Sequence, residues 1–357
     1  ILYIPKKSFS YVRCNGSNEL CPQVNSLKYT DFPGVTDENG SGFSRNQDTY
    51  GICGRFSDVD SICYKLKSLG LWKSKSNCSV MDYQLWVYNK KHKKNGTLDE
   101  LLTEDDKKID NLSHEEILTY AKNIGFCPED RFRSEFMGNS YGNKEYFKKN
   151  LSRDVNSRFS KIKSEAQFSL PGNCPECAEL SPVLTNEQWK SVNVILANTT
   201  NSDPKLAAFN KINDLACPDS VRIKLPKGYS LQSPNGQDPK NWIDAALNQK
   251  EVLVIKIGGK TLDPSLGVAD PSVWDHSAIL AGALCDQDSS KPEGEEHCYY
   301  MIKNSWGLNC RNIKDTEDRK CDKNSGAVLL SWNAISNGID GGARVGTTLK
   351  LVQENTK

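Results

Sequence analysis

Hydrophobic side chains recur at helical spacing over much of the first two thirds of the chain and at strand-like spacing over the last third. The first helical stripe runs from Gly51 or Cys53 to Leu69, and Gly70 is placed to end it. Further helices are predicted from capping pairs and apolar stripes, at Ser113–Glu116, within 147–166, and at Thr185–Gln188, Asp203–Pro204 and Asp238–Pro239. The remaining apolar segments predict strands at 252–257, 277–284, 299–303, 326–331 and 347–352.

The order of these elements predicts an α+β chain with a helical part and a β-rich part. Successive strands with short turns favour an antiparallel barrel or sheet, because parallel neighbours would need crossover helices. We divide the chain into an N-terminal extension (1–28), a helical lobe (29–130), a helical insertion (131–240) and a β-rich lobe (241–357). Residues 1–46 look loop-like, and the lysine run at 90–94 predicts a solvated loop.

Charge and hydropathy argue against two classes of partner. Lys and Arg total 46 against 45 Asp and Glu, so no basic field is present that would gather nucleic acid or anionic lipid. The longest apolar run, 252–257, is far shorter than the roughly 18 residues of a membrane span. We expect no nucleic-acid partner and no membrane span.

Thirteen cysteines predict an oxidising environment, since exposed thiols oxidise and few proteins of reducing compartments carry so many. The protein is expected to be secreted, or to reside in an extracellular, periplasmic, or lysosome- or vacuole-like compartment. The odd count leaves one thiol if the other twelve cysteines form six disulfides. Short spacings favour the pairs Cys14–Cys21, Cys63–Cys78, Cys285–Cys298 and Cys310–Cys321.

Cys174 and Cys177 form a Cys-x-x-Cys motif, which is also half of a zinc site or a redox pair. No second such pair completes four zinc ligands, and the motif lies in a Pro- and Gly-containing loop rather than where a strand meets a helix. We therefore expect no metal and no cofactor.

Cys53 is the candidate for the remaining thiol. It lies in the first turn of the first predicted helix, where the helix dipole and backbone N–H groups favour the thiolate. A thiol of ordinary pKa, about 8.5, is mostly protonated at neutral pH, so a nucleophilic cysteine needs a histidine partner. Of the four histidines, His276 begins a predicted strand, and antiparallel pairing would bring Asn304, at the end of the next strand, near it.

Three motifs resemble the papain and cathepsin family of cysteine peptidases: Gln-x5-Cys at 47–53, Asp-His-Ser-Ala at 275–278 and Lys-Asn-Ser-Trp-Gly at 303–307. The resemblance implies a two-lobed papain-like fold, with the nucleophile on the central helix of a helical lobe and a β-barrel-like second lobe. It implies a peptidase in which Cys53 is the nucleophile, His276 the acid and base, Asn304 the residue that orients His276, and Gln47 part of the oxyanion hole.

The same resemblance implies that Gly51, Asp275 and Trp306 bind substrate or support the site, with Asp275 near the pocket for the side chain two residues before the scissile bond. The expected substrate is a peptide or protein, and the 131–240 block is expected to absorb extra length or to dock a partner. Family members place the histidine and asparagine about 130–150 residues after the cysteine, whereas here they follow Cys53 by 223 and 251 residues.

Two alternatives stay open. A papain-like protein that no longer hydrolyses substrate would act as a binding or structural protein. Two departures from the family pattern favour this reading: Gly54-Arg55 follows the nucleophile, and the family's Cys-Asn-Gly-Gly substrate-binding loop has no convincing counterpart here. Acyl transfer to an amine, as in transglutaminase-like enzymes, would require an acidic third residue where this chain has Asn304.

Overall fold

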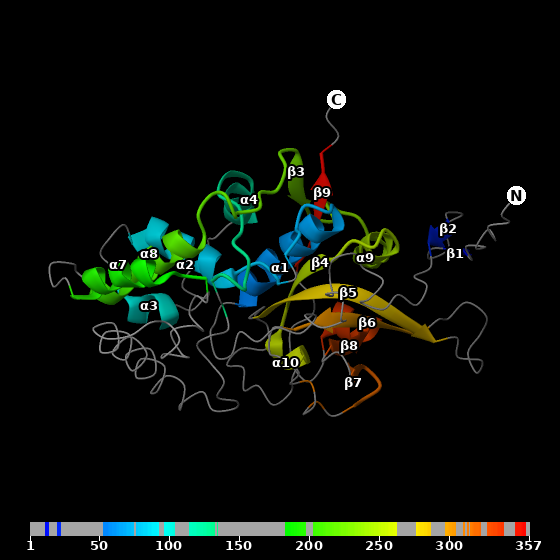
Figure 1. The fold of residues 1–357 in the computed structure, drawn as a ribbon. Coiled ribbons are helices and arrows are strands. Elements are labelled where there is room, and N and C mark those ends of the chain that lie inside the picture. The colour runs from blue at the N-terminus through cyan, green and yellow to red at the C-terminus, as the bar shows by residue number, and fades with distance from the viewer. Residues whose placement is uncertain are drawn as a thin grey trace, which may run out of the picture. The chain divides into compact units, whose positions relative to one another are not determined.

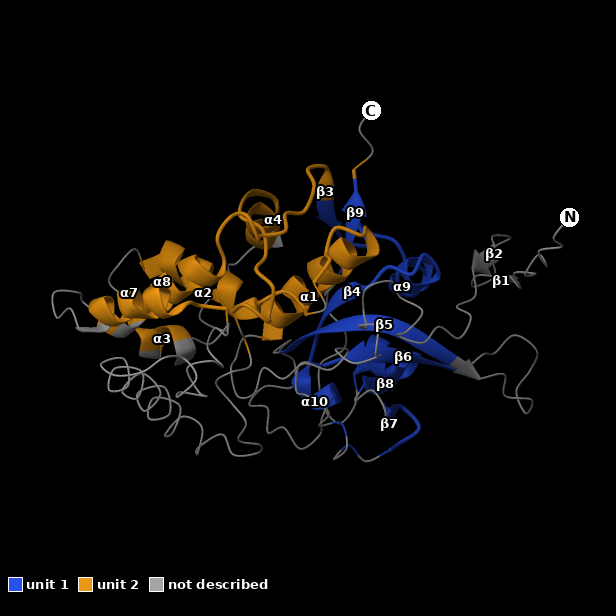
Figure 2. Ribbon diagram, viewed as in Figure 1, with its two compact units in different colours: residues 1–44, 230–304, 308–353 blue, residues 45–229, 305–307, 354–357 orange. Residues whose placement is uncertain are grey.

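The structure is a computed structural model (Figure 1), and it describes residues 11–13, 20–22, 53–74, 76–92, 96–103, 114–132, 134, 183–197, 203–262, 276–286, 297–304, 310, 313, 315–322, 327–338 and 347–354. The chain forms two compact units (Figure 2). The sheet unit comprises residues 1–44, 230–304 and 308–353, and the helical unit comprises 45–229, 305–307 and 354–357. Most of the predicted helical lobe and of the predicted insertion therefore belong to one unit.

Six described helices form the helical unit: α1 (Cys53–Ser68), α2 (Val80–His92), α3 (Leu98–Thr103), α4 (His114–Asn123), α7 (Asn186–Ala197) and α8 (Pro204–Ala216). Helix α1 packs against α2 and α4, and α7 packs against α8. Apolar residues of α1 at helical spacing, among them Phe56, Val59, Ile62 and Leu66, are almost completely buried. Helix α1 thus buries one face in this unit's core, as its apolar stripe predicts.

Local sequence signals set the ends of several helices. Gly70 has φ +68° and allows Leu71 N to donate back to Leu66 O at 3.0 Å, which closes α1. The predicted capping pair at the start of α7 is confirmed, with Thr185 N donating to Gln188 Oε1 at 2.8 Å. Asp203 caps α8 through Leu206 N and also accepts a hydrogen bond from Leu98 N, so one carboxylate holds the starts of α8 and α3 together.

Helix α2 is the main element that the sequence pattern misses. Most of its first nine residues are buried, including Asp82 and Gln84, so α2 lacks the polar face that gives an amphipathic helix its period. The predicted loop at 90–94 is wrong over Lys90–His92, which form the last turn of α2. Basic side chains at that end complement the helix dipole, and Lys90 forms an ion pair with Glu116 of α4 at 2.6 Å.

The sheet has seven strands in the order β3-β9-β4-β5-β6-β8-β7. Their bounds are β3 (Tyr229–Gln232), β4 (Leu253–Ile257), β5 (His276–Asp286), β6 (His297–Lys303), β7 (Arg319–Asp322), β8 (Ala327–Ser331) and β9 (Thr347–Gln353). The five predicted strands are confirmed as β4, β5, β6, β8 and β9, and their pairs are antiparallel. Three short helices accompany them: α9 (Pro239–Asn248), α10 (Gly259–Leu262) and α11 (Trp332–Asn337).

The sequence pattern misses the shortest strands. β3 and β7 have four residues each, too few to establish an alternating pattern. The prediction of loops throughout 1–46 is wrong at β1 (Tyr11–Arg13) and β2 (Leu20–Pro22), which pair antiparallel. The predicted helix within 147–166 lies outside the described residues.

Disulfides join elements in both units. The predicted bonds Cys63–Cys78 and Cys310–Cys321 are present, and Cys298 is disulfide-bonded and lies directly opposite Cys285 in the β5–β6 register. Cys127–Cys217 is a further bond that spacing did not suggest. Cys14 of the predicted Cys14–Cys21 bond and the Cys174/Cys177 motif lie outside the described residues. These bonds fit an oxidising compartment.

None of the described helices is long and apolar enough to cross a membrane.

Candidate active site

Cys53 is the first residue of α1 in the helical unit, and its side chain carries a thiol. The residue is 9% exposed, so the sulfur has limited contact with solvent. The first turn of α1 contains no acidic residue that would oppose a thiolate. Sulfur at this position meets the positive end of the helix dipole, which lowers the free energy of the ionised form.

His276 and Asn304 form the second part of the candidate site, in the sheet unit. His276 begins β5, and Asn304 directly follows the last residue of β6. The antiparallel register pairs Ile279 with Lys303, so the start of β5 and the end of β6 lie side by side at the same end of these two neighbouring strands. His276 Nε2 and Asn304 Oδ1 lie 2.7 Å apart, and both residues are 5% exposed.

The chemistry of the Asn304 side chain assigns the proton in this contact. An amide oxygen can only accept, so the ring nitrogen that faces Asn304 Oδ1 is a donor. This hydrogen bond holds the imidazole plane and places a proton on Nε2 in both the neutral and the charged ring. The other ring nitrogen, Nδ1, is then the one that can gain or lose a proton.

Neighbouring strands fix the position of His276. Its backbone pairs with Ile257 at the end of β4. The next residue, Ser277, is also buried, and its hydroxyl donates to Ile255 O at 3.3 Å. His276 therefore belongs to a central strand that is hydrogen-bonded on both sides, which leaves its backbone little freedom.

Of the other predicted site residues, Gln47, Gly51, Asp275 and Trp306 lie outside the described residues. The structure brings His276 and Asn304 into contact, while Cys53 belongs to the other compact unit. Among the described residues, no group of three or more His, Cys, Asp or Glu side chains is arranged to hold a metal ion.

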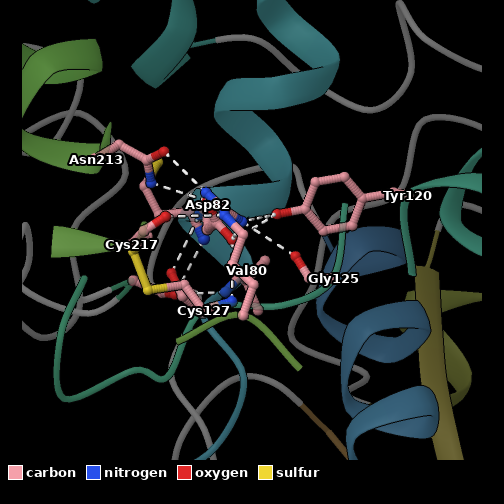
Figure 3. Close-up of polar contacts among 11 residues, drawn as sticks. Val80, Asp82, Tyr120, Gly125, Cys127, Asn213 and Cys217 are labelled. Carbon is pink, nitrogen blue, oxygen red and sulfur yellow. Dashed lines mark hydrogen bonds and ion pairs between the residues drawn. A yellow bond between two sulfur atoms is a disulfide. The ribbon is translucent and has the colours of Figure 1, made fainter. Parts of the chain in front are cut away.

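A second polar centre, which sequence reasoning missed, lies in the helical unit around Asp82 of α2 (Figure 3). The Asp82 carboxylate accepts five hydrogen bonds, from Tyr120 Oη at 2.5 Å, Cys127 N at 3.1 Å, Asn213 Nδ2 at 2.9 Å, and Arg222 Nη1 and Nη2 at 2.7 and 2.9 Å. Arg222 also donates Nε to Cys217 O at 2.9 Å. The centre joins α2 and α4 to the segment around the Cys127–Cys217 disulfide.

Two groups of this centre, Arg222 and Tyr120, have pKa values raised above their ordinary values. Burial alone would lower the pKa of Arg222, but the Asp82 carboxylate outweighs burial and raises that pKa above its ordinary value. Burial, followed by the negative charge of Asp82, raises the pKa of Tyr120 well above 10. The phenol therefore stays protonated and the guanidinium stays charged at any physiological pH, which is typical of a structural network.

No family model matches the chain, and no curated protein matches it. The solved structures that it resembles include two described as the crystal structure of SERA5E from Plasmodium falciparum, one with loop 690–700 ordered. Each is 13% identical over 43% of this chain, with a TM-score of 0.23, and the match covers 70% and 71% of the respective chains.

Proposed function

We propose that this chain is a papain-like cysteine peptidase of an oxidising compartment, which hydrolyses peptide bonds through a thioester on Cys53. The observation that carries the proposal is the buried 2.7 Å contact between His276 Nε2 and Asn304 Oδ1 at one edge of an antiparallel sheet. An asparagine that orients a histidine is the arrangement that a thiol nucleophile needs, because the ring must both take and return a proton. The thiol of Cys53 at a helix start supplies the matching nucleophile.

In the proposed reaction, His276 Nδ1 holds the proton of the Cys53 thiol, and the thiolate sulfur attacks the peptide carbonyl carbon. The carbonyl π electrons move to oxygen, and Gln47 with the Cys53 backbone N–H would stabilise that oxyanion. Collapse of the intermediate breaks the C–N bond as His276 gives its proton to the leaving amine. Water then attacks the thioester while His276 accepts its proton, which yields a carboxylic acid and restores the thiol.

One contact supports the β-barrel-like form of the sheet unit that this proposal includes. Arg319 of the edge strand β7 donates Nη1 to Thr261 O at 3.1 Å, and Thr261 lies in α10, directly after β4. β4 and β7 are four places apart in the sheet order. In a flat sheet, four strand spacings would put β4 and β7 about 19 Å apart, which is farther than an arginine side chain spans. A sheet that curls toward closure, together with the residues between the end of β4 and Thr261, accounts for the contact.

The proposal is tested by covalent labelling of the full chain with a peptidyl epoxide or vinyl sulfone, read by intact mass. We expect one adduct on the wild-type protein, mapped to Cys53, and none on Cys53→Ala. Hydrolysis of a peptide library should be lost in the same variant. The library also tests the expected role of Asp275, because equal cleavage of peptides with Leu or Arg two residues before the scissile bond would remove that role. A wild-type protein that is folded but neither labelled nor hydrolytic would support the silent binding protein instead.

A further inference from the structure

A cavity of about 330 Å³ opens in the helical unit between α2, α4 and α8, beside the Asp82 centre. Its volume is at the lower end of the range for small-ligand sites. Cys53 is not among its lining residues, so the proposed peptidase chemistry does not account for it. The lining is contributed by Asp82, Leu85, Trp86, Asn89, Tyr120, Ile124, Asn210, Asn213, Asp214, Cys217, Pro218, Asp219 and Arg222.

The side chains of Asp82 and Arg222, which we call the floor of the cavity, have almost no hydrogen-bonding capacity left. Asp82 already accepts five hydrogen bonds. The Arg222 guanidinium donates from all three nitrogens, to Asp82, Tyr120, Gly125 O, Asn213 and Cys217 O. The floor is therefore a neutralised and rigid surface, and any ligand must be recognised by the other residues that line the cavity.

The exposed lining residues Asn89, Asp214 and Asp219, which we call the rim, present acceptor oxygens. Asn89 donates Nδ2 to Asn210 Oδ1 at 2.6 Å, and Asn210 in turn donates Nδ2 to Leu206 O at 3.0 Å, which leaves Asn89 Oδ1 as an acceptor. Among the described residues, Asp214 and Asp219 have neither a hydrogen-bond nor an ion-pair partner. Burial raises the pKa of Asp214 even though Lys211 and Arg222 lower it, so nearby cations compensate this carboxylate only in part.

An aromatic wall completes the cavity. Trp86 and Tyr120 line it with ring centroids 5.2 Å apart and planes tilted by 57°. Lys90 Nζ lies 5.3 Å from the centroid of the Trp86 ring, so this indole already takes a cation against its π system. The cavity thus combines an indole and a phenol with three carboxylates against one guanidinium in its lining.

We propose that this cavity binds a guanidinium group, as carried by an arginine side chain. A planar guanidinium stacks on an indole and presents five N–H donors, which match the two carboxylates and the amide oxygen on the rim. A carboxylate or phosphate ligand would be repelled by the carboxylates of Asp214 and Asp219. The guanidinium comes either from an arginine within a protein partner or from a small free molecule.

The test is calorimetric titration of Nα-acetyl-arginine amide into the full chain carrying Cys53→Ala, at low salt, with Nα-acetyl-citrulline amide as the uncharged isostere. We expect saturable millimolar binding of the arginine probe and at least tenfold weaker binding of the citrulline probe. Asp214→Asn/Asp219→Asn should weaken the arginine probe at least tenfold, and Trp86→Phe by severalfold. The charge-matched control Glu187→Gln/Glu354→Gln, at exposed positions outside the lining, should leave binding unchanged.

Two further probes identify the source. Tighter binding of an arginine-centred pentapeptide than of agmatine points to a protein partner, and the reverse order points to a free small molecule. Equal binding of the arginine and citrulline probes, or undiminished binding by the Asp214/Asp219 double variant, would overturn the proposal. Since the readout is binding to a protein that lacks the Cys53 thiol, its outcome is independent of whether the chain is a peptidase.

Discussion

Each compact unit contains a buried polar centre described above, around Asp82 in one and at His276 and Asn304 in the other, and these two centres are built in opposite ways. In the helical unit, Asp82 faces a guanidinium and collects five hydrogen bonds from residues up to 140 positions away. In the sheet unit, His276 faces the uncharged amide of Asn304 across neighbouring strands. The first centre pairs full charges, and the second pairs a titratable ring with a neutral acceptor.

The difference teaches what each centre can do. A carboxylate opposite a guanidinium fixes both charges, because each raises the cost of neutralising the other, so that centre can hold elements together but cannot exchange protons. An amide oxygen orients a ring without adding a charge that would hold it protonated. The sheet unit therefore contains the centre that suits proton transfer, and the helical unit contains the one that suits structure.

The largest effect is expected from breaking the charged pair. Arg222→Met leaves Asp82 buried without its countercharge and should lower the free energy of unfolding by about 3–5 kcal/mol, measured by urea denaturation with disulfides intact. The double variant Asp82→Leu/Arg222→Met should recover a good part of that loss, because it removes the isolated charge. A single variant that costs less than about 1 kcal/mol would mean that the pair behaves like an exposed ion pair.

Removing the neutral orienter should affect activity more than stability. Asn304→Ala leaves His276 without its hydrogen-bond acceptor, and we expect peptide hydrolysis to fall roughly 10²–10⁴-fold in kcat/KM. The melting temperature should change by only a few degrees, since one neutral hydrogen bond is worth about 1 kcal/mol. Steady-state kinetics on a fluorogenic peptide, with Asn304→Gln as the partial control, measures the effect. Hydrolysis by Asn304→Ala at the wild-type rate would remove Asn304 from the mechanism.

A smaller and more diagnostic effect is expected from changing the charge of the orienter. Asn304→Asp keeps an acceptor oxygen but places a negative charge beside His276, which should raise the pKa of the imidazolium. A thiolate–imidazolium pair would then persist to higher pH. The rate of Cys53 alkylation by iodoacetamide as a function of pH measures this, and its alkaline limit should move upward. An unshifted profile would mean that the His276 charge does not govern the reactivity of Cys53.

The smallest effect is expected at Asp244 in the sheet unit, a buried carboxylate that accepts hydrogen bonds from Tyr300 Oη at 2.8 Å and Lys240 Nζ at 2.5 Å. Burial raises its pKa more than Lys240 lowers it. A carboxylate with a raised pKa favours the folded state while protonated, and that contribution is lost as pH rises through the raised pKa. Relative to wild type, Asp244→Asn should therefore gain stability with rising pH, by up to about 1 kcal/mol, measured by denaturation across acidic pH. A difference that is constant with pH would contradict this.

Local patterns were enough to predict the elements that carry the candidate site. The stripe after Cys53 predicted α1, and the predicted strands beginning near His276 and ending before Asn304 are β5 and β6. The proximity of His276 and Asn304 follows from antiparallel pairing alone, since it requires only that neighbouring strands run in opposite directions.

The Asp82 centre could not be predicted in the same way. Its partners lie between 38 and 140 positions from Asp82 in the chain, and tertiary packing alone brings them together. The available signal was an acidic residue among apolar ones at Val80–Leu85, a position that costs free energy unless a distant cation compensates it. The sequence contains 46 lysines and arginines, so that signal did not identify Arg222.

The Cys127–Cys217 disulfide, whose cysteines are 90 residues apart in the chain, makes the segment between them a covalently closed loop. Closing a loop of this length removes about 4–5 kcal/mol of chain entropy from the unfolded state. A proteolytic cut anywhere inside it would leave the two fragments joined, so a clipped molecule would separate into two chains only after reduction. Because the ends of this loop stay joined in the unfolded state as well, a longer or shorter segment between them adds little to the entropy cost of folding, and both of its ends stay anchored.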